Sequence, residues 1–388
     1  MSVCFDPIVA AMSAAPDASQ AVAELAAQLL PATPGFVLFF CSAEYDRSAL
    51  EQAFARHFAG VTLAGCTTAG EITPRGYDQG TICALGFSAS HFQVALACIE
   101  DLAAFDLLQA QKLVDALLQH KLPKNQQQRL AAKAQPFVLT LLDGLSAQEE
   151  MVLLALETAL GNIAHFGGSA GDDNLLSATH IFANGRFYQG AAAVIMLHTT
   201  LPFEVFSTHH VSALTDKLVV TAATPDMRTV QELNAEPAAL AYAAAIGCAV
   251  AELNATVFAM HPLAVKIGKD YYVRSIQRVN PDGSLTFYCA VGLGAVLTTM
   301  QPQPILPDLQ QRFADIEQRI GEPLITIGCD CVLRRLESAE RETLPQASEF
   351  FRAHRVFGFN TYGEHFQGVH LNQTFTGVVI AKPVDRAP

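Results

Sequence analysis

Short, continuous apolar runs alternate with helical segments through the first half of the chain, and this alternation restricts the fold more than any other feature. Phe36–Ser42 and Phe137–Leu142 are apolar almost throughout, as expected of strands that are buried on both faces. Asp46 can cap a helix that carries Leu50 and Phe54 on one face. The pattern predicts an α/β fold in which helices flank mixed sheets.

The pattern changes near Thr200. Beyond it, strand-like runs such as Tyr271–Arg278 and Leu285–Ala290 enclose a Pro-Asp-Gly turn, and helical segments are fewer. We therefore expect α+β character in the second half and two domains, residues 1–200 and 201–388, which suits a chain of 388 residues. No short repeat is evident in the sequence.

Composition excludes several classes of protein. With 51 % apolar and 16 % charged residues, the chain is too apolar to be disordered. The net charge of −13, with no basic cluster, opposes binding to nucleic acid or to anionic membranes. No apolar run reaches the ~18 residues of a membrane span, so we expect no membrane insertion. The N-terminus lacks the pattern of a signal peptide, and the nine cysteines are typical of reduced core thiols, which predicts a cytoplasmic location.

Signatures of catalysis are missing from the sequence. There is no GxSxG elbow, no phosphate-binding P-loop and no HExxH zinc motif. Cys329 and Cys331 are separated by one residue and have no partner pair, so buried thiols explain them better than a metal site. We expect that the protein is not an enzyme.

Two glycine-rich polar loops each follow a strand-like run. They are residues 65–71 and 167–173, and backbone N–H groups in such loops can approach a ligand at the carboxyl ends of strands. An equally good explanation is that the glycines only make tight turns. The candidate ligand-binding residues of these loops are Gly65, Thr67, Thr68, Gly70, Gly168, Ser169 and Asp172.

Histidines in the second half form another set of candidates. His209 and His210 end a strand-like run, His261 precedes Pro262, and His370 follows shortly after His365. A neutral imidazole among apolar residues is a suitable ligand for haem iron. For any one histidine, a core residue with its hydrogen bonds satisfied is the commoner explanation.

These motifs together resemble the FIST domains of bacterial sensory proteins. The first half is similar to the FIST N-terminal domain at residues 37–46, 62–72 and 166–173. The second half is similar to the FIST C-terminal domain at residues 271–276, 327–337 and 358–380. The resemblance covers nearly the whole chain, and it implies a two-domain sensor of a small ligand in signal transduction.

Within that family, residues 217–243 and 260–277 are similar to the haem-binding nitric-oxide sensors called NosP. This closer resemblance implies haem b bound through histidine, nitric oxide as the gas ligand, and regulation of a partner sensor histidine kinase in biofilm or cyclic-di-GMP signalling. It favours His261 as the iron ligand, the one metal ligand expected, with His209 and His210 as rivals. His370 matches the general FIST pattern and is expected to serve the fold or a common pocket. Association into a homo-oligomer is left open.

Two other interpretations remain at the level of sequence. A FIST sensor without haem could bind a small polar molecule, such as an amino acid, at the two glycine-rich loops. A scaffold protein in a signalling complex would bind no ligand at all, and would gain no thermal stability from one.

Overall fold

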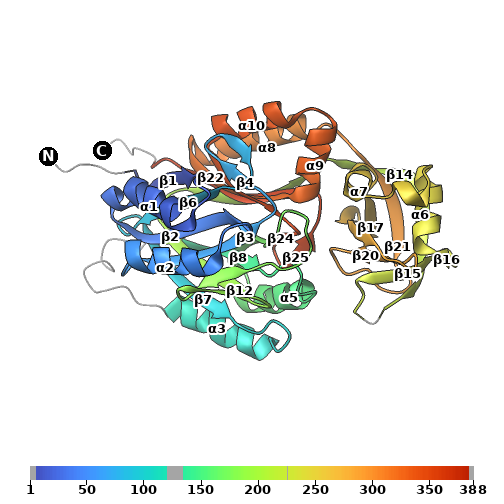
Figure 1. The fold of residues 1–388 in the computed structure, drawn as a ribbon, viewed down its shortest axis with the longest axis horizontal. Helices are drawn as coiled ribbons and strands as arrows, with labels where there is room; N and C mark the ends of the chain where they lie inside the picture. The colour runs from blue at the N-terminus through green and yellow to red at the C-terminus, as the bar shows by residue number, and fades with distance from the viewer. Residues whose placement is uncertain (1–5, 120–133, 225, 384–388) are drawn as a thin grey trace.

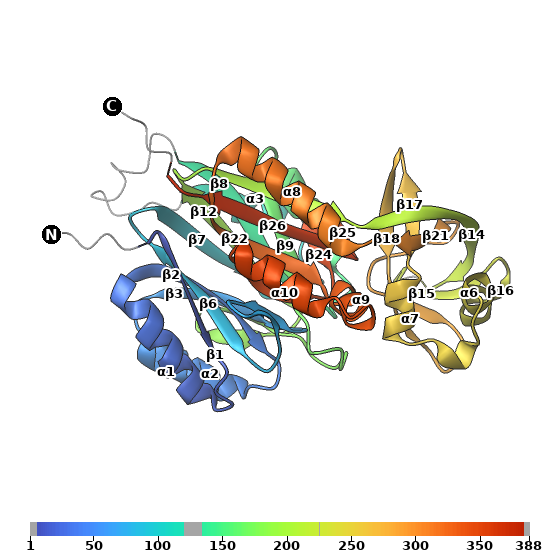
Figure 2. The same cartoon turned by 90° about the horizontal axis from the view of Figure 1, so that it is seen from above.

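The protein is described by a computed structural model that covers residues 6–119, 134–224 and 226–383 (Figure 1). A larger body contains three six-stranded sheets, and a smaller part at one end contains an eight-stranded sheet (Figures 1 and 2). The smaller part, residues 211–302, is here called the insert, because it lies between an edge strand of the body and the helix that follows it. The predicted α/β class is confirmed, with mixed sheets and flanking helices.

The body consists of three units with the same order of elements: an edge strand, a helix, a central strand, one or two further helices, a parallel strand, a hairpin and a returning strand. Unit 1 comprises β1 (Ile8–Ser13), α1 (Ala18–Leu29), β2 (Pro34–Ser42), α2 (Arg47–His57), β3 (Thr62–Thr68), β4 (Glu71–Thr73), β5 (Gly76–Asp78) and β6 (Ile82–Ser88). Unit 2 comprises β7 (Phe92–Ile99), α3 (Leu107–Gln119), β8 (Gln135–Leu142), α5 (Glu149–Leu160), β9 (Ala164–Ser169), β10 (Ile181–Ala183), β11 (Arg186–Tyr188) and β12 (Ala192–Thr199). Unit 3 comprises β13 (Phe203–His209), α8 (Ile305–Ile320), β22 (Pro323–Cys331), α9 (Val332–Glu340), α10 (Leu344–Ala353), β23 (Val356–Thr361), β24 (Glu364–Phe366), β25 (Val369–Leu371) and β26 (Thr374–Ala381).

The hairpin of each unit completes the sheet of another unit. Strand β4 of unit 1 pairs with β23 of unit 3, β24 of unit 3 pairs with β9 of unit 2, and β10 of unit 2 pairs with β3 of unit 1. The three strand orders are therefore equivalent, namely β1-β6-β2-β3-β10-β11, β7-β12-β8-β9-β24-β25 and β13-β26-β22-β23-β4-β5. This cyclic exchange gives the body an approximate threefold arrangement.

Burial explains why the apolar runs form the central strands. The inner faces of the three sheets meet in one core, where the rings of Phe40 and Phe359 stack with centroids 4.6 Å apart. Helices cover the outer faces (Figure 2), so β2 and β8 are buried on both sides, as their sequences predict. Asp46 caps α2 as expected and accepts a hydrogen bond from the backbone N–H of Ala49 at 2.7 Å.

The insert has a core of its own. Its antiparallel sheet is covered by α6 and α7, and Tyr242 and Phe258 pack between sheet and helices. Its elements are β14 (Val211–Ala223), β15 (Thr229–Leu233), β16 (Glu236–Pro237), α6 (Ala238–Ile246), α7 (Ala255–Met260), β17 (Leu263–Ile267), β18 (Asp270–Arg274), β19 (Ile276–Val279), β20 (Leu285–Phe287) and β21 (Val296–Pro302). The β-richer character expected of the second half belongs to this insert, whereas unit 3 returns to the α/β order.

The expected domain boundary at residues 200 and 201 lies between β12 of unit 2 and β13 of unit 3. The division into domains 1–200 and 201–388 stays a prediction. Within the described parts of the chain, every helix is too short or too polar to cross a membrane.

Candidate functional site

The same four-residue motif lies at the end of each parallel strand: a hydroxyl residue, Ala or Tyr, Gly, and an acid. It occupies residues 68–71, 169–172 and 361–364, and the first two copies lie within the candidate ligand loops of the sequence analysis. Register supports the equivalence, because Thr68, Ser169 and Thr361 each pair with the last residue of the central strand. The three turns also bond to one another, for example from Asn360 N–H to the Gly70 carbonyl at 2.7 Å.

In two of the three motifs, the acid accepts hydrogen bonds from hydroxyl groups of its own unit. Glu71 accepts from the Thr68 hydroxyl and, at 2.7 Å, from the Thr81 hydroxyl. Glu364 repeats the arrangement with Thr361 and, at 2.8 Å, with Thr374. Burial raises the pKa of Glu71 to about 7, although these hydrogen bonds oppose the shift, and the pKa of Glu364 is raised to about 7 for the same reason.

The third acid, Asp172, instead organises the loop that follows it. Its Oδ2 accepts from the backbone N–H groups of Ser177 at 2.7 Å and Ala178 at 2.9 Å, and its Oδ1 accepts from the Tyr362 hydroxyl. The loop places Asp173 and Asn174 in the left-handed region, with φ of 52° and 64°. These two residues consequently face away from the core and line a cavity.

Most of the predicted ligand-loop residues have neighbours inside the protein. A Cβ at Gly65 would lie 2.4 Å from the Phe39 carbonyl oxygen, and one at Gly168 would lie 2.4 Å from Thr361 Cγ2. Ser169 Oγ lies 3.0 Å from His365 Nε2, so the Ser169 hydroxyl already has a hydrogen-bond partner. The hydroxyl of Thr67 accepts from the backbone N–H of His180 at 3.0 Å. The hydroxyl of Thr68 donates to Glu71, as described above. Of the seven, Gly70 lies against Arg335, and Arg335 lines a cavity.

That cavity, here called the Arg335 cavity, lies where all three units meet. It has a volume of about 560 Å³, and it is bounded by the hairpin β4–β5 of unit 1, the loop after Asp172 of unit 2, and helix α9 of unit 3. Its lining residues are Tyr77, Asp78, Gln79, Asp173, Asn174, Arg335, Leu336, Ala339 and Leu344.

Arg335 supplies the positive charge of this cavity. Its side chain is largely buried, its Nε has no hydrogen-bond partner among the described residues, and its Nη2 lies 3.9 Å from Asp173 Oδ1. Burial lowers the pKa of Arg335, and the carboxylate of Asp173 opposes that shift, so the guanidinium keeps its charge. Gly70 makes room for it, since a Cβ there would lie 2.9 Å from Arg335 Nη1. Across the cavity, Gln79 donates to Asp173 at 3.2 Å.

Its sequence neighbour, Arg334, has a different role. Arg334 donates to Asp330 at 2.7 Å and to His210 Nδ1 at 2.6 Å, within the core of unit 3. No basic cluster was found in the sequence, and these two adjacent arginines were not singled out as candidate site residues, so the cavity was missed. The signal that could have found it was the third copy of the four-residue motif, at residues 361–364.

Equivalent grooves exist at the other two junctions of hairpin and helix. Between the hairpin β10–β11 and α2 lies an open cavity of about 450 Å³, in which Gln189 occupies the position of Gln79. Its lining residues are Asp46, Arg47, Ser48, Glu51, His180, Phe187 and Gln189.

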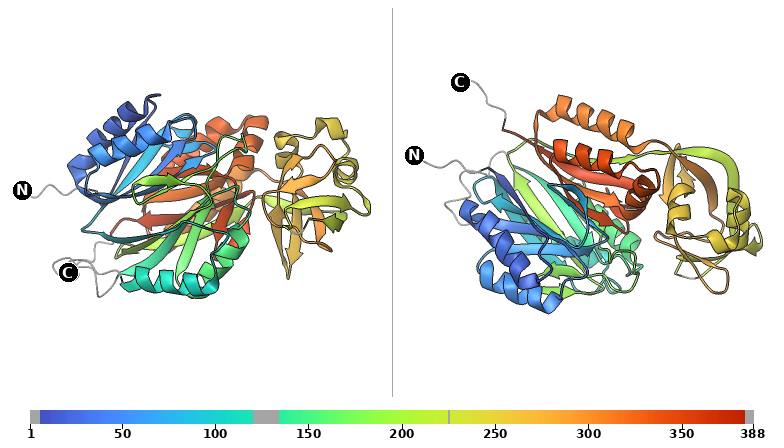
Figure 3. Two further views of the ribbon diagram at one scale, coloured as in Figure 1. Left: turned by 60° about the horizontal axis from the view of Figure 1, so that its bottom comes forward. Right: turned by 45° about the horizontal axis from the view of Figure 1, so that its top comes forward.

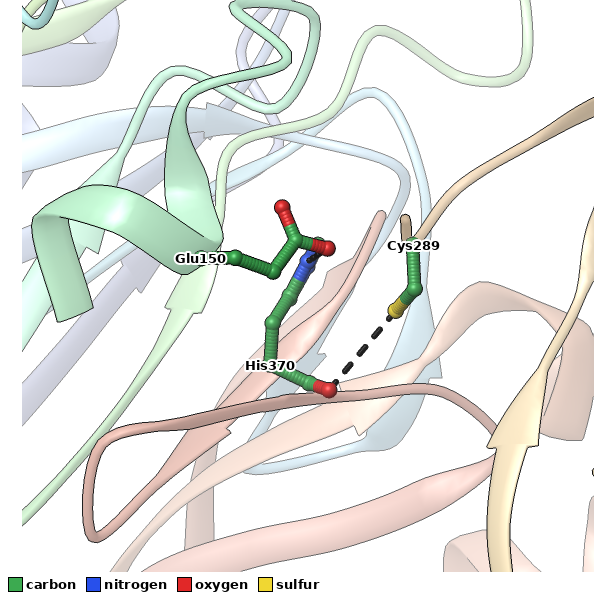
Figure 4. A group of neighbouring side chains, drawn as sticks. All are labelled: Glu150, Cys289 and His370. Atoms are coloured by element: carbon green, nitrogen blue, oxygen red, sulfur yellow. Dashed lines mark hydrogen bonds and ion pairs between the residues drawn. The ribbon is translucent and has the colours of Figure 1, made fainter. Parts of the chain in front are cut away.

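Between the hairpin β24–β25 and α5, the insert occupies the corresponding position (Figure 3). Arg228 of the insert pairs with Glu149 at 2.8 Å and Glu150 at 2.6 Å, and the backbone N–H of Ala290 donates to Glu150 at 2.7 Å. His370 Nδ1 lies 3.2 Å from the same Glu150 carboxylate. Figure 4 shows the His370 ring beside the Glu150 carboxylate, and the Cys289 thiol of the insert directed at the backbone carbonyl of His370, 3.7 Å away. We call this junction the filled groove.

The histidines predicted to bind iron lie apart from these grooves. His210 is buried, and both its ring nitrogens are engaged, by Arg334 and, at 2.6 Å, by Glu337. His209 and His261 are exposed, at the end of β13 and after α7. None of the three lines any of the five principal cavities among the described residues. Partial burial lowers the pKa of His261, so its imidazole is neutral at pH 7.

Comparison with known proteins identifies the chain's family. No curated protein matches the chain, so its closer resemblance to NosP stays a prediction. The crystal structure of a cyanuric acid hydrolase from A. caulinodans aligns over 97 % of this chain and 100 % of that chain, with 10 % identity and a TM-score of 0.38. A TM-score this low supports no conclusion about activity. The model of the FIST N domain matches residues 35–236, and that of the FIST C domain matches residues 238–367. The chain therefore belongs to the FIST family.

Proposed function

We propose that this FIST protein senses a small polar ligand that carries a carboxylate and an amino group, as an α-amino acid does, and that the ligand binds in the Arg335 cavity. FIST domains are sensory domains, so a sensory role follows from the family. The ligand class is inferred from the chemistry of the cavity. The observation that carries the proposal is the largely buried Arg335, whose Nε has no partner among the described residues and whose side chain lines the cavity.

Complementary charges support this ligand class. A guanidinium binds a carboxylate through two parallel hydrogen bonds, and such charge-assisted bonds are the stronger ones in proteins. Asp173, 3.9 Å from the guanidinium, offers a carboxylate to an ammonium group. A cavity of about 560 Å³ suits a molecule of amino-acid size. The ligand would exchange the loose Arg335–Asp173 pair for two closer pairs of its own.

A bound ligand could also affect the rest of the molecule. It would contact elements from all three units, including α9, and α9 packs against α7 of the insert. A ligand that favours one arrangement of α9 over another would shift the position of the insert by its difference in affinity for the two states. A partner, such as a sensor histidine kinase in the cytoplasm, could detect that shift. In this proposal the protein is a sensor and not an enzyme.

Calorimetric titration with a panel of α-amino acids tests the proposal. The panel includes, for each binder, the matched amine and the matched carboxylic acid that lack the other group. We expect Arg335→Gln to weaken binding about 10- to 100-fold, because a hydrogen bond to a charged group is lost. Arg319→Gln, which alters an exposed arginine of α8, is the control and should bind normally. The proposal fails if no amino acid binds, or if Arg335→Gln binds as well as the control.

Haem-based sensing of nitric oxide is the second candidate. The observation in its favour is His261, whose ring is neutral, exposed and without a hydrogen-bond partner among the described residues. The fit is incomplete, because His261 lines no principal cavity and His210 has both ring nitrogens engaged. Haem b would therefore need a rearrangement around α7 to be enclosed. Its iron would supply the binding of nitric oxide.

Absorption spectra after addition of hemin separate the two candidates. If His261 ligates haem, His261→Ala should lose the Soret band of the complex, while His209→Ala should keep it. Wild-type protein that takes up no hemin would exclude this candidate and leave the amino-acid proposal untouched.

A further inference from the structure

We propose that Glu150, Cys289 and His370 form a binding site for a borderline divalent metal ion, with Zn²⁺ as the best match. One donor atom from each side chain lies within 4.8 Å of the other two (Figure 4). The three residues come from separate parts of the chain: α5 of unit 2, the loop after β20 in the insert, and β25 of unit 3. The site is independent of the proposed amino-acid site.

The donor set indicates which metal ions would bind. Thiolate, imidazole and carboxylate are the usual protein ligands of Zn²⁺. Ca²⁺ and Mg²⁺ prefer oxygen ligands alone, so a cysteine and a histidine disfavour both. Three protein ligands leave one position of a tetrahedral ion for water or a small anion.

The two ring nitrogens of His370 have different surroundings. The side chain of His370 is 1 % exposed, and its Nε2 has no hydrogen-bond partner among the described residues. A buried polar nitrogen without a partner is costly, which is why such atoms are rare in native proteins. Residue 363, which lies against this nitrogen, is glycine, and any Cβ there would approach it to 1.9 Å. The backbone of Gly363 therefore covers Nε2. The nitrogen that faces Glu150 is Nδ1, 3.2 Å from Glu150 Oε1, and a metal ion would bind there.

Neighbouring groups already orient the carboxylate and set the local charge. Glu150 Oε1 accepts from the backbone N–H of Ala290 at 2.7 Å, and Glu150 Oε2 accepts from Arg228 at 2.6 Å. Such outer contacts hold metal ligands in position. Arg228 carries the positive charge beside this carboxylate.

A metal ion here would hold the insert in the filled groove. Cys289 belongs to the insert, whereas Glu150 and His370 belong to the body, so coordination would tie the two together. The ion would add to the ion pairs of Arg228, and its binding energy would count toward the stability of the docked state.

Titration of chelator-treated protein with Zn²⁺ and Co²⁺ tests the site. The full chain should bind one equivalent, and the Co²⁺ form should show the thiolate-to-metal charge-transfer band together with intense visible bands of a tetrahedral ion. Cys289→Ser should lower the affinity at least about 100-fold and remove the charge-transfer band. Cys248→Ser, which alters a half-buried cysteine of the same insert, is the matched control and should change neither.

A second variant guards against a folding defect. Glu150→Gln changes a carboxylate that is 28 % exposed, and it should lower the affinity while the charge-transfer band of any bound Co²⁺ persists. Arg335→Gln should bind the metal normally, which separates this result from the fate of the amino-acid proposal. The metal site is ruled out if wild-type protein takes up no ion, or if Cys289→Ser binds Zn²⁺ as tightly as Cys248→Ser.

Discussion

The Arg335 cavity and the filled groove occupy equivalent positions in a threefold frame, yet one is open and the other contains part of the insert. In both, a hairpin of one unit faces a helix of another. In the open cavity the arginine belongs to the frame and its partner carboxylate is distant at 3.9 Å, whereas in the filled groove the arginine comes from the insert and contacts two glutamates at 2.6 and 2.8 Å. The filled groove thus illustrates the contacts that a ligand could make in the open one.

The largest expected effect comes from removing the positive charge that the insert places in the filled groove. Arg228→Met removes the cation but leaves Glu149, which is 1 % exposed, and Glu150 behind. Removal of one partner from a buried ion pair costs about 3–5 kcal/mol of unfolding free energy. Urea unfolding should register this loss, and limited proteolysis should cut the insert faster. Arg278→Met, on an exposed arginine of the insert, is the control, and an equal loss in both variants would contradict the docking role.

The buried acids Glu71 and Glu364 should have a second, slightly smaller effect, on the pH dependence of the unfolding free energy. The pKa of Glu71 is raised to about 7 in the folded protein, above its ordinary value of 4.5, so the folded state holds the proton more tightly than the unfolded state does. The stabilisation from this difference is therefore complete below pH 4.5 and is lost as the pH rises to about 7, by about 3 kcal/mol in all.

Glu71→Gln should remove this contribution. We expect a flatter dependence of unfolding free energy on pH between 5 and 8, measured by urea titration at each pH. Glu364→Gln should flatten it by a similar amount, because its carboxyl group has the same partners and the same raised pKa of about 7. An unchanged slope in both variants would mean that neither carboxyl group is linked to folding.

The smallest effect compares the turns of two hairpins. Gly185 and Gly368 both have positive φ, 83° and 75°, so alanine is strained at either position, by about 1 kcal/mol. A Cβ at Gly185 meets nothing within 4 Å, whereas one at Gly368 would lie 2.6 Å from Glu157 Cβ of α5. Gly368→Ala should therefore lower the unfolding free energy by ~1–3 kcal/mol more than Gly185→Ala does. Thermal unfolding of the two variants should show the lower melting temperature for Gly368→Ala. Equal losses would show that the hairpin β24–β25 does not press on α5.

Local patterns in the sequence predict much of the body. The apolar runs at residues 36–42 and 137–142 form β2 and β8, and Asn184–Gly185, a dipeptide typical of hairpin turns, forms the turn between β10 and β11. These predictions succeed because strand burial and turn geometry depend on neighbouring residues. The two glycine-rich loops were expected to follow strands, but they begin later than expected, because residues 65–68 belong to β3 and residues 167–169 belong to β9.

The threefold arrangement could not be obtained from local patterns. Strand β4 pairs with β23 across almost the whole chain, as in the Glu71–Phe359 register, and no short window contains both partners. The insert also separates β13 from α8, which hides the third unit behind residues with a different pattern. Arg335 was missed for a related reason, since its neighbours Gly70 and Asp173 come from other units.

The exchange of hairpins has a consequence for how the chain reaches its native state. Unit 1 contributes β4 and β5 to a sheet whose other strands, β13, β22, β23 and β26, all lie beyond residue 202. That sheet therefore stays incomplete until those strands have emerged from the ribosome. Contacts so distant in sequence slow the folding of a protein and keep unpaired edges exposed meanwhile. A shortened chain that ends before β23 would present one such bare edge, and we expect it to aggregate.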